Sequence, residues 1–209
     1  MKIATMALVI ISFTAYIYAM ESDERADGDG RSLGDLIATN QVEIRMNTGA
    51  LIVTNFNGIS SLACNNVNKN FADDVQVFHY NRSYLTNVTL TDLSVFNNLQ
   101  ELALEYCFIR QLQFDDNKTL PALRILSLAC NELKKIELEK LLKAMPQLKR
   151  LNLSNNPIEE IILDGEYQHA SLGYIILVKT DYLKESKKMA LADKIRNSTV
   201  TGKQPVIGW

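Results

Sequence analysis

The 209-residue sequence has few of the residues that mark an enzyme site, a disulfide scaffold or a nucleic-acid-binding protein. It contains two His, three Cys and four Pro, and its 22 basic residues are nearly balanced by 24 acidic ones. Three cysteines are too few for a disulfide-dense scaffold, and a net charge of −2 excludes a global basic field that attracts nucleic acid. Because 47% of the residues are hydrophobic, the chain is neither collagen-like nor wholly disordered.

The usual short motifs of catalysis and metal binding are also missing. No CxxC, HExxH, glycine-rich phosphate loop or EF-hand pattern occurs in the sequence. His79 and His169 are the two histidines, and no nucleophile motif accompanies them. The paired carboxylates Asp115–Asp116 and Glu159–Glu160 are expected on solvated loops. The sequence therefore predicts a protein that is not an enzyme and holds neither metal nor cofactor.

An internal repeat organises residues 75–180. The pattern L-x-x-L-x-L-x-x-[NC]-x-L begins at Leu99, Leu123 and Leu148, with weaker copies from Val75 and Leu172. These starts lie 24, 24, 25 and 24 residues apart. Position numbers below count from the first residue of each copy, so that Cys107 is at position 9 of the copy from Leu99. Two further columns recur, at Val88, Leu112, Ile136 and Ile161, and at Phe96, Leu120, Met145 and His169.

The spacing of the apolar positions predicts a short strand in each copy. Positions 4 and 6 alternate as a strand requires, and position 9 turns the chain with an inward Asn or Cys. One copy cannot bury its own apolar face, so stacked copies share a continuous core. Short helices are expected at 136–145, from its i, i+3, i+4, i+7 pattern, and at 91–96 with Thr91 as N-cap.

These copies resemble extracellular leucine-rich repeats of the 24-residue type, and the segment 151–158 (LNLSNNPI) is close to that family's best-known wording. The resemblance implies an α/β solenoid: a short curved array with a parallel concave sheet. In chain type and size, the sequence is similar to short secreted insect leucine-rich-repeat proteins of immunity. That likeness implies a secreted, non-enzymatic protein that recognises protein or microbial ligands. The alternative is a structural subunit that forms a complex with a sister extracellular protein.

The N-terminal residues are typical of a secretory route. Residues 1–19 read as a signal peptide, with Lys2 before an apolar run and a small residue at Ala19; an uncleaved anchor is the rival interpretation. Residues 20–35 form an acidic lead, which we expect to be flexible. The mature protein is therefore expected to be extracellular, without stable membrane insertion.

Both ends of the repeat array need covering. Residues 36–74 are expected to hold an N-terminal cap, a β-hairpin turning at 47–49, and a degenerate first repeat. Residues 181–209 are expected to supply a C-terminal cap helix that uses Tyr182, Leu183, Met189, Leu191 and Ile195. A tail from Asn197 to Trp209 follows, which is expected to be poorly ordered unless Trp209 docks.

The repeat register also predicts the binding surface, because the non-leucine residues of each strand face outward on the concave side. The candidate binding residues are His79, Arg82, Glu101, Glu105, Tyr106, Arg124, Lys149, Arg150 and Tyr174. Aromatic and guanidinium groups dominate measured interface hot spots, which singles out Tyr106, Arg124 and Arg150. An ordinary solvated sheet surface is the alternative interpretation for each residue.

Two kinds of covalent modification follow from the sequence. N-x-S/T sequons, the acceptors of N-linked glycans, occur at Asn81, Asn87, Asn117, Asn152 and Asn197. Three cysteines cannot all pair within the chain, and Cys107 at position 9 is expected to be buried. The hypothesis is an intermolecular disulfide through Cys64 or Cys130, giving a dimer or a hetero-complex.

Overall fold

The computed structural model describes residues 43–47, 50–54, 61–64, 69–81, 85–163, 169–180, 183–197 and 205–209. The predicted signal peptide (1–19) and acidic lead (20–35) lie outside the described residues, as do Arg82 and Tyr182.

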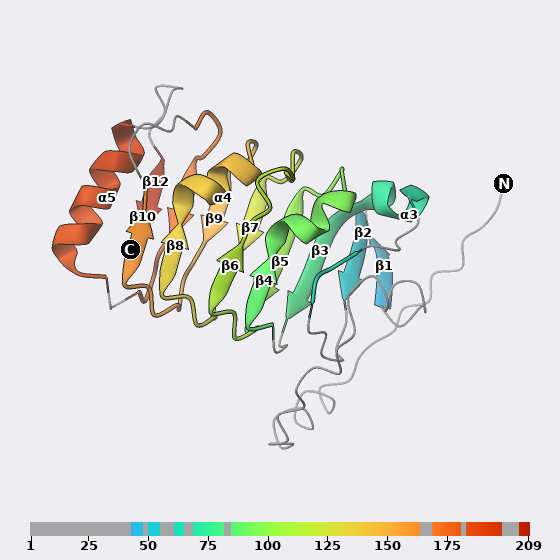
Figure 1. The fold of residues 1–209 in the computed structure, drawn as a ribbon, viewed down its shortest axis with the longest axis horizontal. Helices are drawn as coiled ribbons and strands as arrows, with labels where there is room; N and C mark the ends of the chain where they lie inside the picture. The colour runs from blue at the N-terminus through green and yellow to red at the C-terminus, as the bar shows by residue number, and fades with distance from the viewer. Residues whose placement is uncertain are drawn as a thin grey trace, which may run out of the picture.

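One strand from each repeat joins a sheet of eight strands, which follow one another along the long axis of the molecule (Figure 1). In spatial order they are β1 (Glu43–Asn47), β2 (Ala50–Thr54), β3 (Val75–Asn81), β5 (Glu101–Glu105), β7 (Ile125–Ser127), β9 (Arg150–Asn152), β11 (Tyr174–Ile176) and β12 (Val206–Gly208). The hairpin β1–β2 is antiparallel, and every other neighbouring pair in this sheet is parallel. The predicted α/β solenoid with an N-terminal hairpin cap is confirmed.

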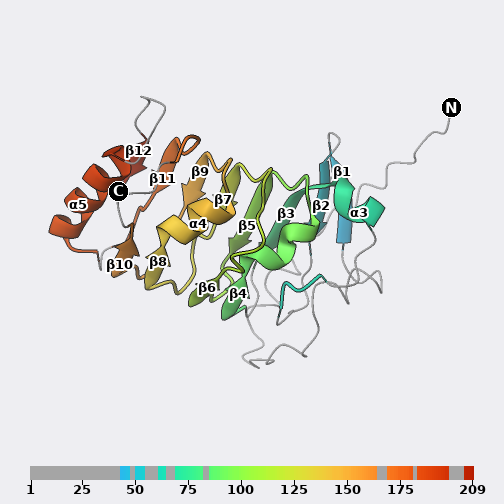
Figure 2. The same ribbon diagram turned by 45° about the horizontal axis from the view of Figure 1, so that its top comes forward.

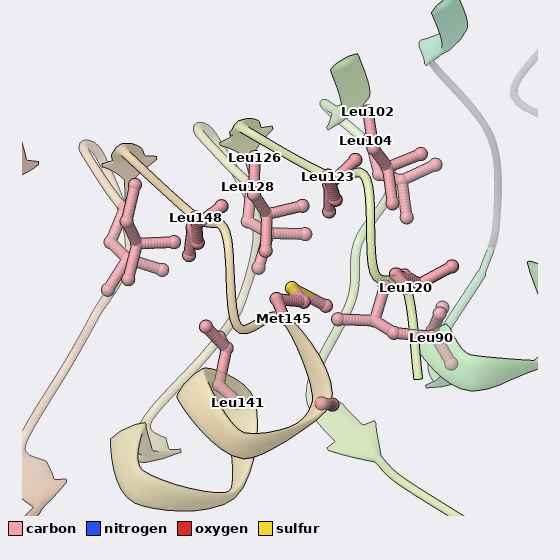
Figure 3. Packing of buried hydrophobic residues seen from close by; sticks show 14 of the residues in the cluster. Leu90, Leu102, Leu104, Leu120, Leu123, Leu126, Leu128, Leu141, Met145 and Leu148 are labelled. Carbon is pink, nitrogen blue, oxygen red and sulfur yellow. The ribbon is translucent and has the colours of Figure 1, made fainter. Parts of the chain in front are cut away.

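The apolar columns of the sequence become one continuous core. Leu102 pairs in register with Leu126, which pairs with Leu151, and all three are fully buried. Figure 3 shows the leucines of successive repeats stacked side by side, with Met145 and Leu141 below them. Burying each such side chain contributes about 1.5–3 kcal/mol to the stability of the fold. Each leucine is buried by contact with the neighbouring repeats, so one repeat alone cannot gain this free energy.

The opposite side of the core is covered by short strands and helical turns (Figures 1 and 2). The elements there are α3 (Lys69–Asp74), β4 (Asn87–Thr89), a 3₁₀ helix (Leu90–Val95), β6 (Gln111–Gln113), β8 (Lys135–Glu137), α4 (Leu138–Ala144) and β10 (Glu160–Ile162). Strand β4 pairs with β6, and β8 pairs with β10, as two separate two-stranded sheets. Helix α4 confirms the helix expected within 136–145.

The predicted N-cap at Thr91 is wrong. The 3₁₀ helix begins one residue earlier, at Leu90, with Thr89 at its N-cap and no capping side-chain bond. Thr91 is instead fully buried, and its Oγ1 accepts a hydrogen bond from the backbone N–H of Asp115 at 2.9 Å. The hydroxyl therefore serves the next repeat rather than its own helix.

A buried polar ladder at position 9 joins the repeats. Asn131 Oδ1 accepts from the backbone N–H groups of Cys107 and Ile109 in the preceding repeat, at 3.0 and 3.1 Å. Asn131 Nδ2 donates to Leu104 O at 2.8 Å and to Leu128 O of its own repeat at 2.9 Å. One side chain thus satisfies backbone groups that the turn would otherwise bury unpaired.

The same role recurs at the other copies. Asn156 Oδ1 accepts from Leu133 N at 3.1 Å, and its Nδ2 donates to Leu128 O at 2.9 Å. Cys107 is buried, as predicted, and its thiol donates to Tyr80 O at 3.2 Å. Position 9 can therefore hold an amide or a thiol side chain, provided that it donates hydrogen bonds to the backbone carbonyls around it.

The C-terminal cap is more extensive than the sequence predicts. Helix α5 (Glu185–Asn197) lies across the end of the array and buries Leu191 and Ile195, whereas Met189 is exposed. Lys187 and Lys194 of α5 donate through Nζ to the carbonyls of Glu159 and Leu163, at 3.1 and 2.9 Å.

The expectation of a poorly ordered tail is wrong for residues 205–209. Strand β12 pairs in parallel with β11, so that Ile207 stands opposite Ile175 and extends the position-4 column. Its bonds are Val206 N to Gly173 O at 2.8 Å and Leu177 N to Gly208 O at 2.6 Å. Lys188 Nζ lies 5.6 Å from the Trp209 ring centroid, a cation–π contact between α5 and the residue that follows β12.

Replacing Asn131 with alanine tests the ladder. The change leaves two N–H groups and two carbonyls without their side-chain partner in the core, so we expect a loss of about 2–4 kcal/mol in the free energy of unfolding. Urea unfolding followed by circular dichroism measures it. Asn98→Ala is the matched control, because Asn98 is exposed. Equal losses for the two variants would contradict the ladder's role.

Candidate functional site

The candidate site is the solvent-exposed side of the eight-stranded sheet, called the open face below. It is formed by positions 3, 5 and 7 of the repeats, as the predicted concave face requires, because positions 4 and 6 point into the core. Of the nine candidate binding residues, eight are described, and the parallel register places them on this face or along its margin. Arg82 falls outside the described residues.

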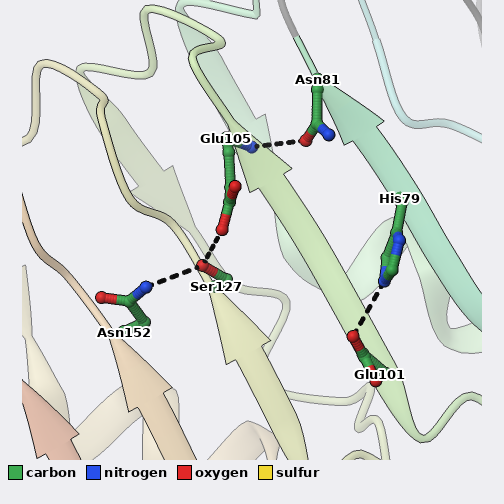
Figure 4. A network of polar contacts seen from close by, with 6 residues as sticks. All are labelled: His79, Asn81, Glu101, Glu105, Ser127 and Asn152. Atoms are coloured by element: carbon green, nitrogen blue, oxygen red, sulfur yellow. Dashed lines mark hydrogen bonds and ion pairs between the residues drawn. The ribbon is translucent and has the colours of Figure 1, made fainter.

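The N-terminal half of the open face carries a polar network in two parts, the His79–Glu101 pair and a separate set of bonds through Glu105, Ser127 and Asn152 (Figure 4). His79 Nε2 lies 2.9 Å from Glu101 Oε1 on the next strand. Ser127 Oγ donates to Glu105 Oε1, and Asn152 Nδ2 donates to Ser127 Oγ at 3.2 Å. The two glutamates predicted as binding residues therefore already have partners within the sheet.

The C-terminal half of the open face has a different character. Arg124, Lys149 and Arg150 are exposed, and none of these side chains has a hydrogen bond or ion pair with the described part of the chain. Beyond them, Tyr174 is 52% exposed and stands opposite Val206, which is 56% exposed. Cationic and apolar side chains thus lie side by side on β9, β11 and β12.

Position 8 forms one margin of the open face and has an unusual backbone. Tyr106, Cys130, Asn155 and Lys179 all have positive φ, between 55° and 58°. The backbone N–H of Cys130 donates to Ser154 O at 2.9 Å, and that of Asn155 donates to Val178 O at 2.9 Å. This left-handed turn aims position 9 inward, and it strains any residue other than glycine. Tyr106 is therefore presented outward, 53% exposed.

Sequence reasoning missed several apolar members of this surface. Val178 and Val206 are exposed there. Phe108, at position 10 and beyond the end of β5, is also exposed and has a positive φ of 55°. A positive φ is usually predicted from a glycine in the sequence. Among the described residues, those that adopt it are not glycine, so the sequence does not reveal these turns. Val206 was missed because β12 lacks the leucine that opens the other copies.

Neither histidine is placed for acid–base catalysis among the described residues. His79 pairs with Glu101 on the open face, with no nucleophile in contact. His169 is buried, and its Nδ1 accepts from Leu172 N at 2.9 Å while Nε2 donates to Met145 O at 3.4 Å. Burial lowers the pKa of His169, and the bond to Met145 offsets this only in part, so the ring is a neutral core residue.

The paired carboxylates also have structural partners. Asp115 accepts from the backbone N–H of Asn117 at 3.0 Å, and this bond is the main reason that its pKa is lowered. Glu159 and Glu160 lie 3.8 and 3.7 Å from Lys134 and Lys135. Within the described ranges, no group of three or more His, Cys, Asp or Glu side chains is arranged to hold a metal ion.

The cysteines separate into buried and accessible groups. Cys64 is 3% exposed and its thiol donates to Leu62 O at 3.2 Å. Burial, followed by the negative charge of Asp92, raises the pKa of the Cys64 thiol to about 12. Burial and the raised thiol pKa both disfavour an intermolecular disulfide at Cys64. Cys130 is partly exposed on the margin and carries a free thiol.

The five sequon asparagines are distributed over the whole described surface. Asn81 and Asn152 lie on the open face, whereas Asn87 and Asn117 lie on the outer strands and turns, and Asn197 ends α5. All are exposed except Asn152, which is partly buried in the polar network. A glycan at Asn81 would obstruct the N-terminal half of the open face.

A hollow of about 340 Å³ lies on the other side, between β6 and β8. Leu112, Phe114, Ile136 and Leu141 supply its apolar lining. The charges at its rim are paired locally, for example Arg110 with Glu132 at 2.6 Å. It offers fewer unsatisfied groups to a ligand than the open face does.

Comparison with known proteins supports the fold. A family model described as leucine-rich repeats (2 copies) matches residues 121–165. No curated protein matches the chain. Residues 121–165 are therefore leucine-rich repeats, and the open, mostly parallel sheet around them fits the α/β solenoid that such repeats form. Solenoids of this class are typically binding modules, whose extended sheet faces contact other proteins.

The buried His169 predicts a pH dependence of stability. Because its folded pKa lies below the usual 6.5, the unfolded chain takes up the proton first as the pH falls, and stability is lost below about pH 6.5. In His169→Asn, Oδ1 replaces Nδ1 as the backbone acceptor and does not titrate. We expect a shallower loss for this variant in urea unfolding between about pH 7 and pH 5. Parallel pH profiles for the two proteins would refute the assignment.

Proposed function

We propose that this protein is a secreted, non-enzymatic leucine-rich-repeat protein that binds a protein ligand, or a microbial surface ligand, through its open face. The single observation that carries the proposal is the exposed aromatic and basic cluster on the sheet, where Arg150 and Tyr174 stand opposite each other on adjacent strands. Such side chains dominate binding energy at protein interfaces. An ordinary solvated sheet face needs no exposed tyrosine beside an unpaired arginine.

Secretion is part of the proposal and rests on the sequence. The supporting features are the apolar run of residues 1–19 and five sequons. No helix in the described part of the chain is both long and apolar enough to cross a bilayer. The role in innate immunity rests on the likeness to short secreted insect immune proteins.

Affinity capture from native extracellular fluid, followed by mass spectrometry, tests the binding surface. We expect Tyr174→Ala to reduce capture of the partner about tenfold, as loss of an interface hot spot does. Met189→Ala is the control, because Met189 is an exposed apolar residue of α5 away from the open face. Equal capture by both variants and the unaltered protein would argue against this surface.

The sequons provide a separate test of the secretory route. We expect a glycan at Asn117, which is exposed on a turn, and none at Asn152, whose Nδ2 donates to Ser127 while Oδ1 accepts from Ser154 Oγ at 2.7 Å. Asn87 is also expected to be modified more fully than Asn152. Site-resolved glycopeptide mass spectrometry of the secreted protein measures the occupancies. Higher occupancy at Asn152 than at Asn117 would contradict the expectation.

A further inference from the structure

Basic side chains in the described part of the chain differ in whether they have a partner. Eight have a carboxylate partner within 4 Å: Arg110, Lys118, Lys134, Lys135, Lys140, Lys143, Lys188 and Arg196. Lys187 and Lys194 donate to backbone carbonyls instead. Five have neither kind of partner among the described residues: Arg124, Lys149, Arg150, Lys179 and Lys184. Arg124, Lys149 and Arg150 lie together at positions 2 and 3 of adjacent repeats, whereas Lys179 is on the margin and Lys184 directly precedes α5. Three of the five unpaired cations are therefore gathered on two neighbouring repeats.

The backbone fixes the spacing of these three cations. Lys149 N and Arg150 N both donate to Arg124 O, at 2.8 and 3.0 Å, and Tyr174 N donates to Lys149 O at 3.0 Å. Neighbouring strands of such a ladder lie about 4.8 Å apart, so the backbone positions of the cations and the tyrosine form one fixed row. Binding therefore has to order the side chains of this row but not the strands that carry them.

The two glutamates of the open face are bonded to other side chains. Glu101 on β5 is in register with Ile125, one strand away, but its carboxylate is directed to His79 at 2.9 Å. Glu105 accepts from Ser127 Oγ. The polar network of the N-terminal half thus holds both carboxylates away from the cations.

An apolar surface continues the row on its far side. Tyr174 and Val206 are neighbours at position 3, and Ile176 is partly buried next to Gly208. A Cβ at Gly208 would lie 3.9 Å from Ile176 Cγ2, so the glycine leaves the isoleucine uncovered. Val178, 40% exposed, extends the surface toward the margin.

We propose that the C-terminal half of the open face binds an acidic polypeptide segment that also carries apolar or aromatic side chains. Its carboxylates pair with Arg124, Lys149 and Arg150, and its apolar side chains cover Tyr174, Ile176 and Val206. A polyanion without apolar groups satisfies the cations alone and leaves the adjacent apolar surface in water. This inference rests on the proposed binding function and specifies the chemistry of the ligand.

Fluorescence anisotropy with synthetic peptides tests the inference on the full chain. The probes are a short labelled peptide that alternates glutamate and phenylalanine, the same peptide with serine for phenylalanine, and the same peptide with lysine for glutamate. We expect the glutamate–phenylalanine peptide to bind at least about tenfold more tightly than either of the others, and its affinity to fall as salt is raised.

Two variants connect the peptide to named residues. Arg124→Gln, Lys149→Gln and Arg150→Gln combined should weaken binding about tenfold or more. The matched triple Lys134→Gln, Lys135→Gln and Lys140→Gln, with the same change in charge on the other side, should leave it unchanged. Tyr174→Ala should weaken the phenylalanine peptide and not the serine peptide. Circular dichroism confirms that each variant is folded.

The outcomes separate this inference from the proposed function. Equal affinity for both acidic peptides and for a heparin fragment would reduce the site to a general anion patch and overturn the inference. Failure of every peptide, with native capture that depends on His79 and Glu105, would overturn the inference and leave the proposed function standing. Native capture that no open-face variant alters would overturn the proposed function, and the peptides would still decide the chemistry of the site.

Discussion

The buried side chain at position 9 bonds the backbone of its own turn to that of the preceding repeat, and the rest of the fold depends on it. Each repeat must reverse direction inside the core, where water cannot satisfy peptide groups. Asn131 and Asn156 supply the missing partners in both directions. Because consecutive turns share these bonds, the strands stay in register, and the register in turn decides which side chains reach the open face. The leucine columns drive association of the repeats, whereas the ladder fixes their alignment.

The fold was predictable from sequence wherever residues that recur with the repeat occupy the same structural position. Leu102, Leu126 and Leu151 recur because each occupies the same buried position, so a period of about 24 residues carries the geometry with it. Prediction failed where a contact joins different repeats or remote segments. Thr91 resembles a helix cap locally, yet its hydroxyl serves Asp115 of the following repeat. Strand β12 has no repeat signature, and its place depends on the free edge that β11 leaves.

The candidate site was predictable in position but not in character. Register alone places His79, Glu101 and Arg150 on one face. It does not tell which charges are already neutralised, because that depends on side-chain directions across strands: Glu101 turns to His79, and Glu105 to Ser127. The division of the open face into a self-satisfied half and an unsatisfied half is therefore a tertiary property. The half whose side chains have partners is bonded internally, and the other half is the one to which we assign the proposed ligand.

Strand β12 differs from the inner strands in when it can pair, because α5 separates it from its partner β11 in the chain. Each inner strand is followed within one repeat by its neighbour, so its free edge is short-lived during synthesis. Strand β11 ends at Ile176 but receives its partner only when Val206–Gly208 arrives, after α5 has been made. Until then, an edge with Tyr174 beside it is open to pairing with any extended chain. The interval from Tyr174 to its partner Val206 is 32 residues, whereas 24 or 25 residues separate partners on the inner strands, so the last strand closes the array over a longer loop that contains α5.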